Sequence, residues 1–265
     1  MIRAIFLDVD GTLISFRTHE VPASAVEALR RARERGVRLF IATGRAVTDL
    51  ELLEPIPYEG VVALNGAECV LRDGRVVVRH PIPREEFERA LALSDEWDFP
   101  VGLELNEGIF VNRVTPVVEE LARMIAHPVP EVADLRRLFD RGDCCQMCFY
   151  VDPQLGGRIM DRLPSLTATR WCPIFSDVNV RGVDKATGMA EFAARCGFGI
   201  EETMAFGDGG NDAPMLCAAG VGVAMGGAYD EALQAADWVT ATVDDDGIRR
   251  ALEHFGVIEG AGVSK

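Results

Sequence analysis

Both ends of the chain alternate between predicted strands and predicted helices, and this rhythm limits the fold more than any other feature. Residues 4–9 and 37–42 are short apolar runs with the length and composition of buried strands. Between them, residues 24–35 carry apolar side chains at helical spacing, and Gly36 is a typical residue at a helix end. A strand–helix–strand order implies a parallel sheet with right-handed crossovers.

The same rhythm extends through both terminal parts of the chain. Further helices are predicted at 45–53, 186–196, 212–219, 230–236 and 248–254, and further strands at 61–64, 203–206, 221–224 and 238–240. Asp73 and Gly74 separate two apolar runs, a pattern that predicts a hairpin. Residues 1–81 and 182–265 are therefore predicted to form one α/β core, a doubly wound, Rossmann-like parallel sheet.

The middle of the chain follows a different pattern. Predicted strands at 101–105 and 109–111, and again at 167–171 and 175–180, are joined by short turns, which indicates antiparallel pairing. The other predicted elements are helices at 85–97, 116–126 and 155–163 and a strand at 146–151. Residues 82–181 are therefore predicted to form an α+β domain inserted into the core.

The chain is strongly acidic, which narrows the class of its partners. It has 27 Lys and Arg residues against 42 Asp and Glu residues, a formal net charge of −15 at pH 7. Nucleic acid and anionic membrane surfaces are also negative, so we expect no nucleic acid and no membrane as partners. A small anionic substrate is compatible with this charge, because a metal ion and a few cations set the local field of a site.

The sequence shows no targeting or membrane-spanning segment. The first apolar run meets Asp8 too early for a signal peptide. The longest uncharged run, between Asp212 and Asp230, is interrupted by proline and glycine and is too short for a membrane span. Seven cysteines, an odd number, indicate reduced thiols. We therefore expect a cytoplasmic location.

One group of cysteines raises the alternative of a zinc or redox site. Cys145 and Cys148 form a C-x-x-C pair, with Cys144 beside them. The run continues as an apolar strand, in which residues three apart point to opposite faces. A second such pair, which a structural zinc site needs, does not occur in the sequence. We therefore interpret the three cysteines as buried strand thiols.

Four polar segments stand at the ends of predicted core strands or at the start of a helix. They are Asp8-Val9-Asp10-Gly11-Thr12, Thr43-Gly44-Arg45, Lys185, and Gly207-Asp208-Gly209-Gly210-Asn211-Asp212. Each one alone has an ordinary explanation: an acidic turn, a helix-capping turn, a solvated lysine or a glycine-rich loop. In an open parallel sheet, however, ligands bind just beyond the carboxyl ends of the strands. Their order and placement together predict a ligand site, and the two carboxylates among the glycines at 207–212 favour a hard cation in it.

These segments resemble the motifs of the haloacid dehalogenase superfamily of phosphohydrolases, and the arrangement is similar to its Cof-type subfamily IIB. Asp8 to Thr12 match the first motif, Thr43 the second, Lys185 the third, and Gly207 to Asp212 the fourth. The insertion between Thr43 and Lys185 stands where that subfamily carries its α/β cap. The resemblance covers essentially the whole chain and is strongest to bacterial hexose-phosphate phosphatases.

The resemblance implies a role for each motif residue. Asp8 would attack phosphorus and form an aspartyl-phosphate, and Asp10 would act as general acid and base. Asp8 and Asp208, with the main-chain carbonyl of Asp10, would hold Mg²⁺, and Asp212 would orient or bind it, in part through water. Thr43 and Lys185 would hold the phosphoryl oxygens. Other implied contacts to the substrate come from Thr12, Gly44, Arg45, Asn65 and Asn211. For Arg45 the sequence leaves open whether it reaches the phosphate or forms an exposed ion pair.

The predicted strand at 175–180 is the candidate for reading the rest of the substrate. Asp177 and Asn179 fall on one face of it, and they could bind neighbouring sugar hydroxyls. The alternative is a solvated polar face on a half-buried strand. Because this strand leads into the boundary at residue 182, we expect its end to lie near the cleft between cap and core.

The leading functional hypothesis is therefore a Mg²⁺-dependent hydrolase of sugar phosphate monoesters. A sugar phosphomutase, which would need a bisphosphate activator, is the first alternative. A non-enzymatic phospho-acceptor module is the second, but an acid/base at Asp10 and a cap serve no purpose there. A dehalogenase would not need Asp10, Asp208 and Asp212.

Overall fold

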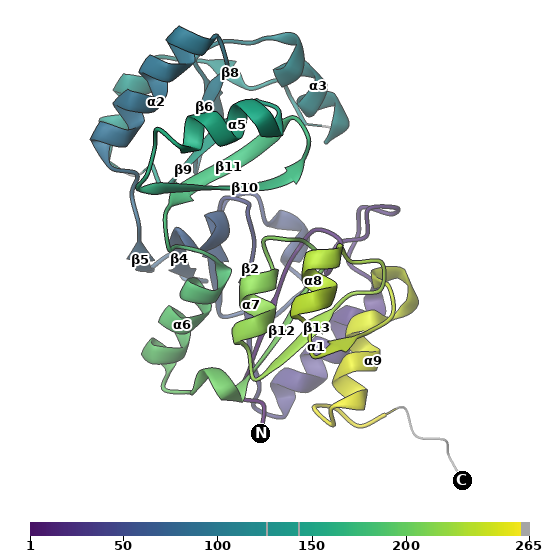
Figure 1. Cartoon of the computed structure of the whole chain (residues 1–265). Coiled ribbons are helices and arrows are strands. Elements are labelled where there is room, and N and C mark those ends of the chain that lie inside the picture. The colour runs from purple at the N-terminus through teal and green to yellow at the C-terminus, as the bar shows by residue number, and fades with distance from the viewer. Residues whose placement is uncertain (126, 143, 261–265) are drawn as a thin grey trace. The chain divides into compact units, whose positions relative to one another are not determined.

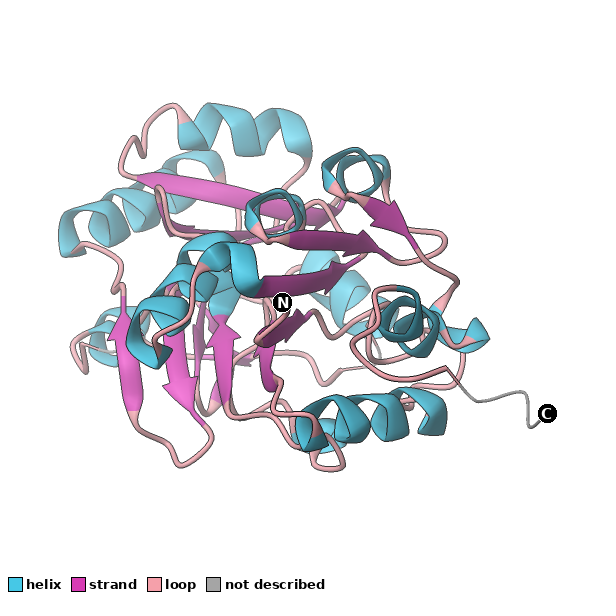
Figure 2. Cartoon of the chain, turned by 90° about the horizontal axis from the view of Figure 1, so that it is seen from below, coloured by secondary structure: helices cyan, strands magenta, loops and turns pink. Residues whose placement is uncertain are grey.

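The computed structural model describes residues 1–125, 127–142 and 144–260, and it divides into two compact units. The first, the core, comprises Met1–Val78 and Asp184–Lys265, and the second, the cap, comprises Arg79–Val183. The predicted boundaries, after residue 81 and before residue 182, differ from these divisions by a few residues. Helices pack on strands in both units (Figure 2).

The core contains an eight-stranded sheet, with its strands in the order β14-β13-β12-β1-β2-β3-β4-β5. The strands are β1 (Ala4–Leu7), β2 (Arg38–Ala42), β3 (Gly60–Ala63), β4 (Glu68–Leu71), β5 (Val76–Arg79), β12 (Thr203–Gly207), β13 (Val221–Ala224) and β14 (Trp238–Val239). Neighbours from β14 to β3 pair in parallel, whereas β4 runs antiparallel to β3. Strand β1 thus lies in the middle of the sheet, between β2 and β12.

Helices cover both faces of this sheet (Figure 1). On one face lie α6 (Lys185–Cys196), α7 (Ala213–Ala218) and α8 (Asp230–Ala235), and on the other α1 (Ala23–Glu34) and α9 (Gly247–His254). Short 3₁₀ helices complete the core: η1 (Glu51–Leu53), η2 (Leu64–Gly66), η3 (Ile200–Glu202) and η4 (Val243–Asp245). Every side chain of β1 is buried, because both of its faces are covered; this is why the strand is a continuous apolar run.

Contacts between aromatic rings hold α6 against the sheet. The rings of Phe6 and Phe40, from neighbouring strands, stack with their centroids 4.9 Å apart, and Phe192 of α6 lies 4.7 Å from Phe40. All three side chains are fully buried, and each such burial stabilises the fold by about 1.5–3 kcal/mol. The helix that begins at Lys185 is therefore held firmly against the central strands.

The cap contains a six-stranded mixed sheet in the order β10-β11-β9-β6-β7-β8. Its strands are β6 (Val101–Leu105), β7 (Gly108–Val111), β8 (Glu131–Val132), β9 (Gln146–Phe149), β10 (Leu166–Cys172) and β11 (Phe175–Val180), and its helices are α2 (Arg84–Trp97), α3 (Pro116–Met124), α4 (Leu135–Phe139) and α5 (Pro153–Met160). Helices α2, α4 and α5 pack on one face, around Phe87, Leu103 and Met147. Helix α3 packs on the other face, against Cys148 and Phe175.

The predicted helix at 45–53 is wrong. The structure has turns there, followed only by η1. The cause is the use of the Arg45 carbonyl: it accepts a hydrogen bond from the N–H of Leu64 at 3.1 Å instead of one from within a helix. Three apolar residues of this segment, Ala46, Leu50 and Leu53, are nevertheless buried, whereas Leu52 is exposed. The apolar spacing was therefore a sign of burial and not of a helix.

Two short elements of the cap, β8 and α4, were not predicted. Asp134 caps α4, since its side chain accepts hydrogen bonds from the N–H groups of Arg136 and Arg137, and this capping residue was the available signal. The predicted helix at 116–126 begins as expected, but its last residue, Ala126, lies outside the described residues. The other predicted elements occur with shifts of a few residues at their ends.

The cysteines of the structure are free thiols, and Cys144, Cys145 and Cys148 are buried. Burial, followed by the carboxylates of Glu104 and Asp177, raises the pKa of the Cys148 thiol well above its ordinary value. Cys148 is thus a buried, uncharged thiol within β9, and the strand interpretation is confirmed in that respect. Within the described residues, none of the helices combines the length and the apolar character needed to cross a membrane.

Candidate active site

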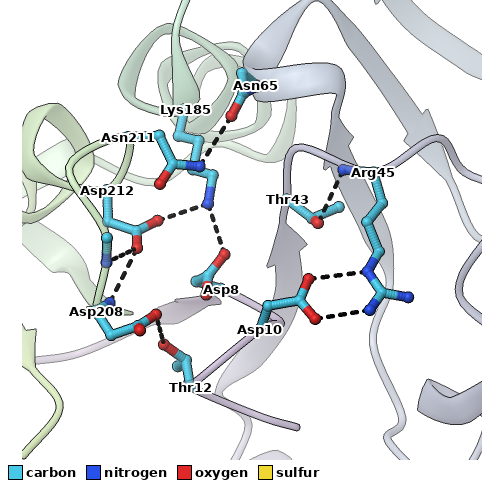
Figure 3. A network of polar contacts seen from close by, with 11 residues as sticks. Asp8, Asp10, Thr12, Thr43, Arg45, Asn65, Lys185, Asp208, Asn211 and Asp212 are labelled. Carbon is cyan, nitrogen blue, oxygen red and sulfur yellow. Dashed lines mark hydrogen bonds and ion pairs between the residues drawn. The ribbon is translucent and has the colours of Figure 1, made fainter. Parts of the chain in front are cut away.

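Three core strands each end directly before a site residue. Asp8 follows β1, Thr43 follows β2 and Asp208 follows β12. Because these strands are parallel neighbours, their carboxyl ends meet at one edge of the sheet, which is where ligands bind in such folds. Topology thus collects residues that are far apart in the sequence (Figure 3).

An acidic cluster forms the centre of this edge. Asp8, Asp208 and Asp212 each offer a carboxylate oxygen, and these atoms all lie within 4.8 Å of one another. The side chains of Asp8 and Asp212 are buried, with residue exposures of 6% and 1%. Three carboxylates packed this closely repel each other strongly unless cations accompany them.

Lys185 supplies one of the required positive charges. Its side chain is fully buried, and its Nζ lies 2.6 Å from Asp8 Oδ1 and 2.6 Å from Asp212 Oδ1. Lys185 is the first residue of α6, where a capping box between Asp184 and Thr187 fixes the start of the helix. A residue from the far part of the chain is thereby placed between two of the carboxylates.

One lysine does not balance three carboxylates, and the pKa values show this. Burial first, and then the charge of Asp212, raises the pKa of Asp8 well above its ordinary value. The same two causes raise the pKa of Asp208 to about 6. For Lys185, burial alone would lower the pKa, but the carboxylates of Asp212 and Asp8 outweigh burial and raise it. The site therefore lacks positive charge.

The residues present fit a hard divalent cation. The cluster offers only carboxylate oxygens as ligands. Three carboxylates and one ammonium leave a net charge of −2, which a divalent cation would neutralise. Asp212 is already engaged, since its Oδ2 accepts the N–H groups of Asp208 at 3.0 Å and of Gly209 at 2.8 Å. This arrangement suits Asp212 to orienting the cluster, and it leaves Asp8 and Asp208 as the more available donors.

Gly11 is required beside this cluster. Its φ is +83°, and a Cβ atom there would lie 2.3 Å from Asp208 Oδ2. The next residue, Thr12, is fully buried, and its hydroxyl donates a hydrogen bond to Asp208 Oδ1 at 3.3 Å. Any larger residue at position 11 would displace Asp208.

On the other side of Asp8, Asp10 pairs with Arg45. The guanidinium donates from Nε to Asp10 Oδ2 at 2.9 Å and from Nη2 to Oδ1 at 2.7 Å. The backbone N–H of Arg45 donates to the Thr43 hydroxyl oxygen at 3.1 Å. Of the two interpretations of Arg45, the structure thus shows an ion pair, though a partly buried one.

A second loop adds amide groups at the edge of the site. Asn211 Nδ2 donates to Asn65 Oδ1 at 3.0 Å. Leu64 and Asn65 both have a left-handed backbone, with φ of 49° and 53°. A Cβ at Gly66 would lie 2.0 Å from the carbonyl oxygen of Asp184, so this loop packs closely against the residue before Lys185.

The structure brings together most of the residues predicted from the sequence. Ten of them are labelled in Figure 3: Asp8, Asp10, Thr12, Thr43, Arg45, Asn65, Lys185, Asp208, Asn211 and Asp212. Gly44 lies between Thr43 and Arg45 in the chain. Asp177 belongs to the other unit and takes part in a separate network.

That network is a row of polar side chains on the cap sheet. Gln146 of β9 donates from Nε2 to Glu104 Oε2 at 2.7 Å and to Asp177 Oδ1 at 3.1 Å. Asn179 Nδ2 donates to Gln146 Oε1 at 3.1 Å. Asp177 and Asn179 are only 7% and 1% exposed, so the alternative of a solvated polar face is wrong.

Sequence reasoning missed several residues of these networks. Asp184 was not singled out, although an aspartate directly before a predicted helix signals a cap. Glu104 and Gln146 were missed because each falls inside an ordinary strand pattern. Their partners come from strands that are adjacent only in the folded sheet.

Comparison with known proteins supports a single family. A sequence profile described as haloacid dehalogenase-like hydrolase matches residues 5–252. The putative phosphatase YkrA of Bacillus subtilis (strain 168) is 29% identical over 259 residues, covering 97% of this chain and 99% of YkrA.

Two solved structures extend this result. BT1666 of Bacteroides thetaiotaomicron, described among phosphatases of the superfamily, is 53% identical with a TM-score of 0.95, covering 97% of this chain and 96% of that one. BT4131, described as a subclass IIB sugar phosphatase, is 35% identical with a TM-score of 0.86, covering 97% of this chain and 100% of that one. The chain belongs to the haloacid dehalogenase-like hydrolase family and is a phosphatase.

Proposed function

We propose that the protein is a Mg²⁺-dependent phosphatase that hydrolyses sugar phosphates and prefers hexose phosphates. In this proposal the reaction proceeds through an aspartyl-phosphate on Asp8. The observation that carries the proposal is the cluster of Asp8, Asp208 and Asp212 around the buried ammonium of Lys185. It combines a nucleophile, a cation site and a fixed positive charge at the edge of the sheet where substrates bind.

In the first half of the reaction, a carboxylate oxygen of Asp8 attacks phosphorus. The bond between phosphorus and the sugar oxygen breaks, and the sugar leaves as an alkoxide that takes a proton from Asp10. Asp8 Oδ1 is held by Lys185, which leaves Oδ2 as the attacking atom. The products of this half are the free sugar and a phosphorylated Asp8.

In the second half, a water molecule attacks the phosphorus of the aspartyl-phosphate. Asp10, now a carboxylate, takes a proton from that water, and the bond between phosphorus and Asp8 breaks. Inorganic phosphate leaves, and both aspartates return to their starting states. Hydrolysis needs the same group at both steps, first as acid and then as base.

Fixed donors hold the oxygens of the transferring phosphoryl group. Lys185 contributes its buried ammonium. Thr43 accepts the N–H of Arg45 at its hydroxyl oxygen, so its own O–H remains to donate. Asp8, Asp208 and the main-chain carbonyl of Asp10 would hold Mg²⁺, with Asp212 orienting the set, and the ion would supply charge that offsets repulsion between nucleophile and phosphate.

The polar row of the cap supports a sugar as the leaving group. Gln146, Asp177 and Asn179 carry carboxylate and amide groups that orient one another, and Asp177, at 7%, is the most exposed of the three. Such preformed acceptors and donors match neighbouring hydroxyl groups, and hydrogen bonds to a charged partner are worth about 1.5–3 kcal/mol. The similarity to BT4131, a sugar phosphatase, points the same way.

The test of the proposal is to trap the intermediate. Wild-type protein with Mg²⁺ and labelled phosphoester should carry acid-stable label on Asp8, and Asp8→Asn should carry none and release no phosphate. Exhaustive EDTA treatment should stop turnover, and Mg²⁺ should restore it, whereas Zn²⁺ should restore it poorly because the site offers only oxygen ligands. Full turnover in Asp8→Asn, or after EDTA, would refute the proposal.

The substrate class is tested separately. Phosphate release across a panel of phosphorylated metabolites should be fastest with hexose phosphates. Asp177→Ala should lower kcat/KM about 10-fold or more for a hexose phosphate and hardly change it for p-nitrophenyl phosphate, which has no hydroxyl groups to bind. Equal losses on both substrates would show that Asp177 serves only the stability of the cap. Interconversion of hexose phosphates without release of phosphate would instead identify a phosphomutase.

A further inference from the structure

Arg45 holds both carboxylate oxygens of Asp10. Its Nε and Nη2 lie 2.9 Å and 2.7 Å from the two oxygens, so two hydrogen bonds run side by side from the guanidinium to the carboxylate (Figure 3). An aspartate side chain has two rotatable bonds, and a two-pronged contact fixes both of them. A single contact would leave the carboxylate free to turn.

The guanidinium is itself held in place. Its Nη1 donates to the carbonyl oxygen of Asp49 at 3.3 Å and to Asp49 Oδ2 at 3.4 Å. The backbone of Arg45 is anchored as well, because its N–H binds the Thr43 hydroxyl oxygen and its carbonyl accepts the N–H of Leu64, each at 3.1 Å. One residue thus links the loop after β1 to the loop after β2.

The effect of this ion pair on stability can be separated from its effect on turnover. The side chains of Arg45 and Asp10 are 27% and 41% exposed. Pairs with this exposure usually contribute about 0–1 kcal/mol, and two-pronged geometry is the case in which they contribute most. The place of the pair beside Asp8 and Thr43 gives its ordered geometry a second use.

We propose that Arg45 is a positioning residue, which fixes the carboxylate of Asp10 in the orientation that proton transfer needs. The inference rests on the proposed function, in which Asp10 is the acid and base. It assigns to Arg45 no contact with the phosphoryl group. The contribution of Arg45 should therefore depend on how much the leaving group needs a proton.

The experiment is a double-mutant cycle on two substrates. Arg45→Ala, Asp10→Ala and the double variant are compared with wild type on a hexose phosphate and on p-nitrophenyl phosphate, whose leaving group departs without a proton. General acid catalysis is worth about 10²–10⁴-fold, so Arg45→Ala should lose about 10–100-fold in kcat on the hexose phosphate and less than about threefold on the aryl phosphate. In the Asp10→Ala background, Arg45→Ala should cause no further loss.

Arg38→Ala is the matched control. Arg38 stands at the start of β2 and forms a similarly exposed ion pair, in which Glu59 Oε2 accepts from both Nε at 2.8 Å and Nη2 at 2.6 Å, with side chains 33% and 31% exposed. Its removal should leave both activities at wild-type level, and its effect on thermal unfolding gives an upper limit for the stability cost of losing such a pair, because Arg38 also contacts the rings of Phe40 and Phe198. Arg45→Lys keeps the charge without the fork, so it should stay below wild type on the hexose phosphate.

The outcomes separate the inference from the proposed function. Equal losses on both substrates, a further loss in the Asp10→Ala background, or full activity of Arg45→Lys would overturn the positioning role of Arg45. If Asp10→Ala alone kept full activity on the hexose phosphate, the acid/base step of the proposed function would be wrong, and this inference with it.

Discussion

At the scale of single residues, the balance of charge at the site explains the raised pKa values of its carboxylates and the need for a further cation. Asp8, Asp208 and Asp212 share one ammonium, that of Lys185, and the pKa values of Asp8 and Asp208 rise because of burial and mutual repulsion. In the proposed reaction, a carboxylate with a raised pKa would be a poor nucleophile until a further cation favours its ionised form. We therefore expect cation binding and activation of Asp8 to be one event.

The raised pKa of Asp208 predicts how cation binding depends on pH. Its value of about 6 in the folded protein exceeds the ordinary value of 3.8, so the folded state holds the proton more tightly. This contribution to stability is fully present below pH 3.8 and is lost as pH rises through about 6. A cation bound beside Asp208 would compensate this loss at neutral pH, and protons would compete with it under acidic conditions.

We therefore expect Mg²⁺ to stabilise the protein much more at about pH 7.5 than at about pH 5. At 100-fold excess over its Kd, a ligand stabilises by about 2.7 kcal/mol, which corresponds to roughly 5–10 °C in Tm for a chain of this size. Thermal unfolding with and without Mg²⁺ at both pH values is the measurement. Asp208→Asn, which keeps the acceptor for Thr12, should lose most of the shift. Equal shifts at the two pH values would contradict this account.

At the scale of elements, α6 sets the position of Lys185. The helix approaches the sheet closely at Gly188, where an added Cβ would lie 2.3 Å from Val62 Cγ1. Lys185 stands one turn before this point, at the capped start of the helix. Small displacements of α6 therefore move the ammonium relative to Asp8.

Gly188→Ala should accordingly reduce both stability and turnover. Overpacking costs about 1–3 kcal/mol, and the gain in helix propensity offsets at most about 1 kcal/mol of that. Urea denaturation and kcat are the measurements. Gly157→Ala in α5 is the control, since a Cβ there meets no atom of the described residues within 4 Å; it should stabilise by about 0.4–1 kcal/mol and leave kcat unchanged. Unaltered kcat in Gly188→Ala would show that the position of α6 tolerates such a shift.

Elements also show what could be predicted from the sequence. Strands such as β1 were found because burial on both faces leaves a continuous apolar run. The segment from Arg45 to Leu53 was mistaken for a helix because its apolar spacing reports burial, while the hydrogen bond from Leu64 to the Arg45 carbonyl is invisible in the sequence. Local patterns predict local structure, and they fail where a distant backbone group takes a hydrogen-bonding partner.

At the scale of the whole molecule, the chain has separate hydrophobic cores. One cluster around Phe6, Phe40 and Phe192 lies within the core unit, and another around Phe87 and Leu103 lies within the cap. The grouping of the core motifs could be predicted because the candidate site residues lie in short segments at the ends of strands. The polar row of the cap could not, because Glu104, Gln146 and Asp177 meet only through strand pairing.

Separate hydrophobic cores predict separate responses to damage. Leu103 is fully buried in β6, and Leu103→Ala should cost about 2–5 kcal/mol in the cap. Amide hydrogen exchange, read by mass spectrometry, should rise across Arg79–Val183 and stay unchanged in the rest of the chain. Phe40→Ala should give the reverse pattern. A uniform rise of exchange in either variant would show that the two units unfold together.

The place of β1 in the middle of the core sheet has a consequence for the order in which the site can form during synthesis of the chain. On the ribosome, β1 is made long before β12 (Thr203–Gly207), so one of its edges stays open until that strand has been made. Asp8 is 177 positions away from Lys185, and the carboxylates of Asp208 and Asp212 come later still. A chain that stops before Lys185 holds the Asp8 carboxylate without the ammonium that pairs with it. We expect such a fragment to release no phosphate, because the site that the proposed reaction needs is complete only after Asp212 has been made.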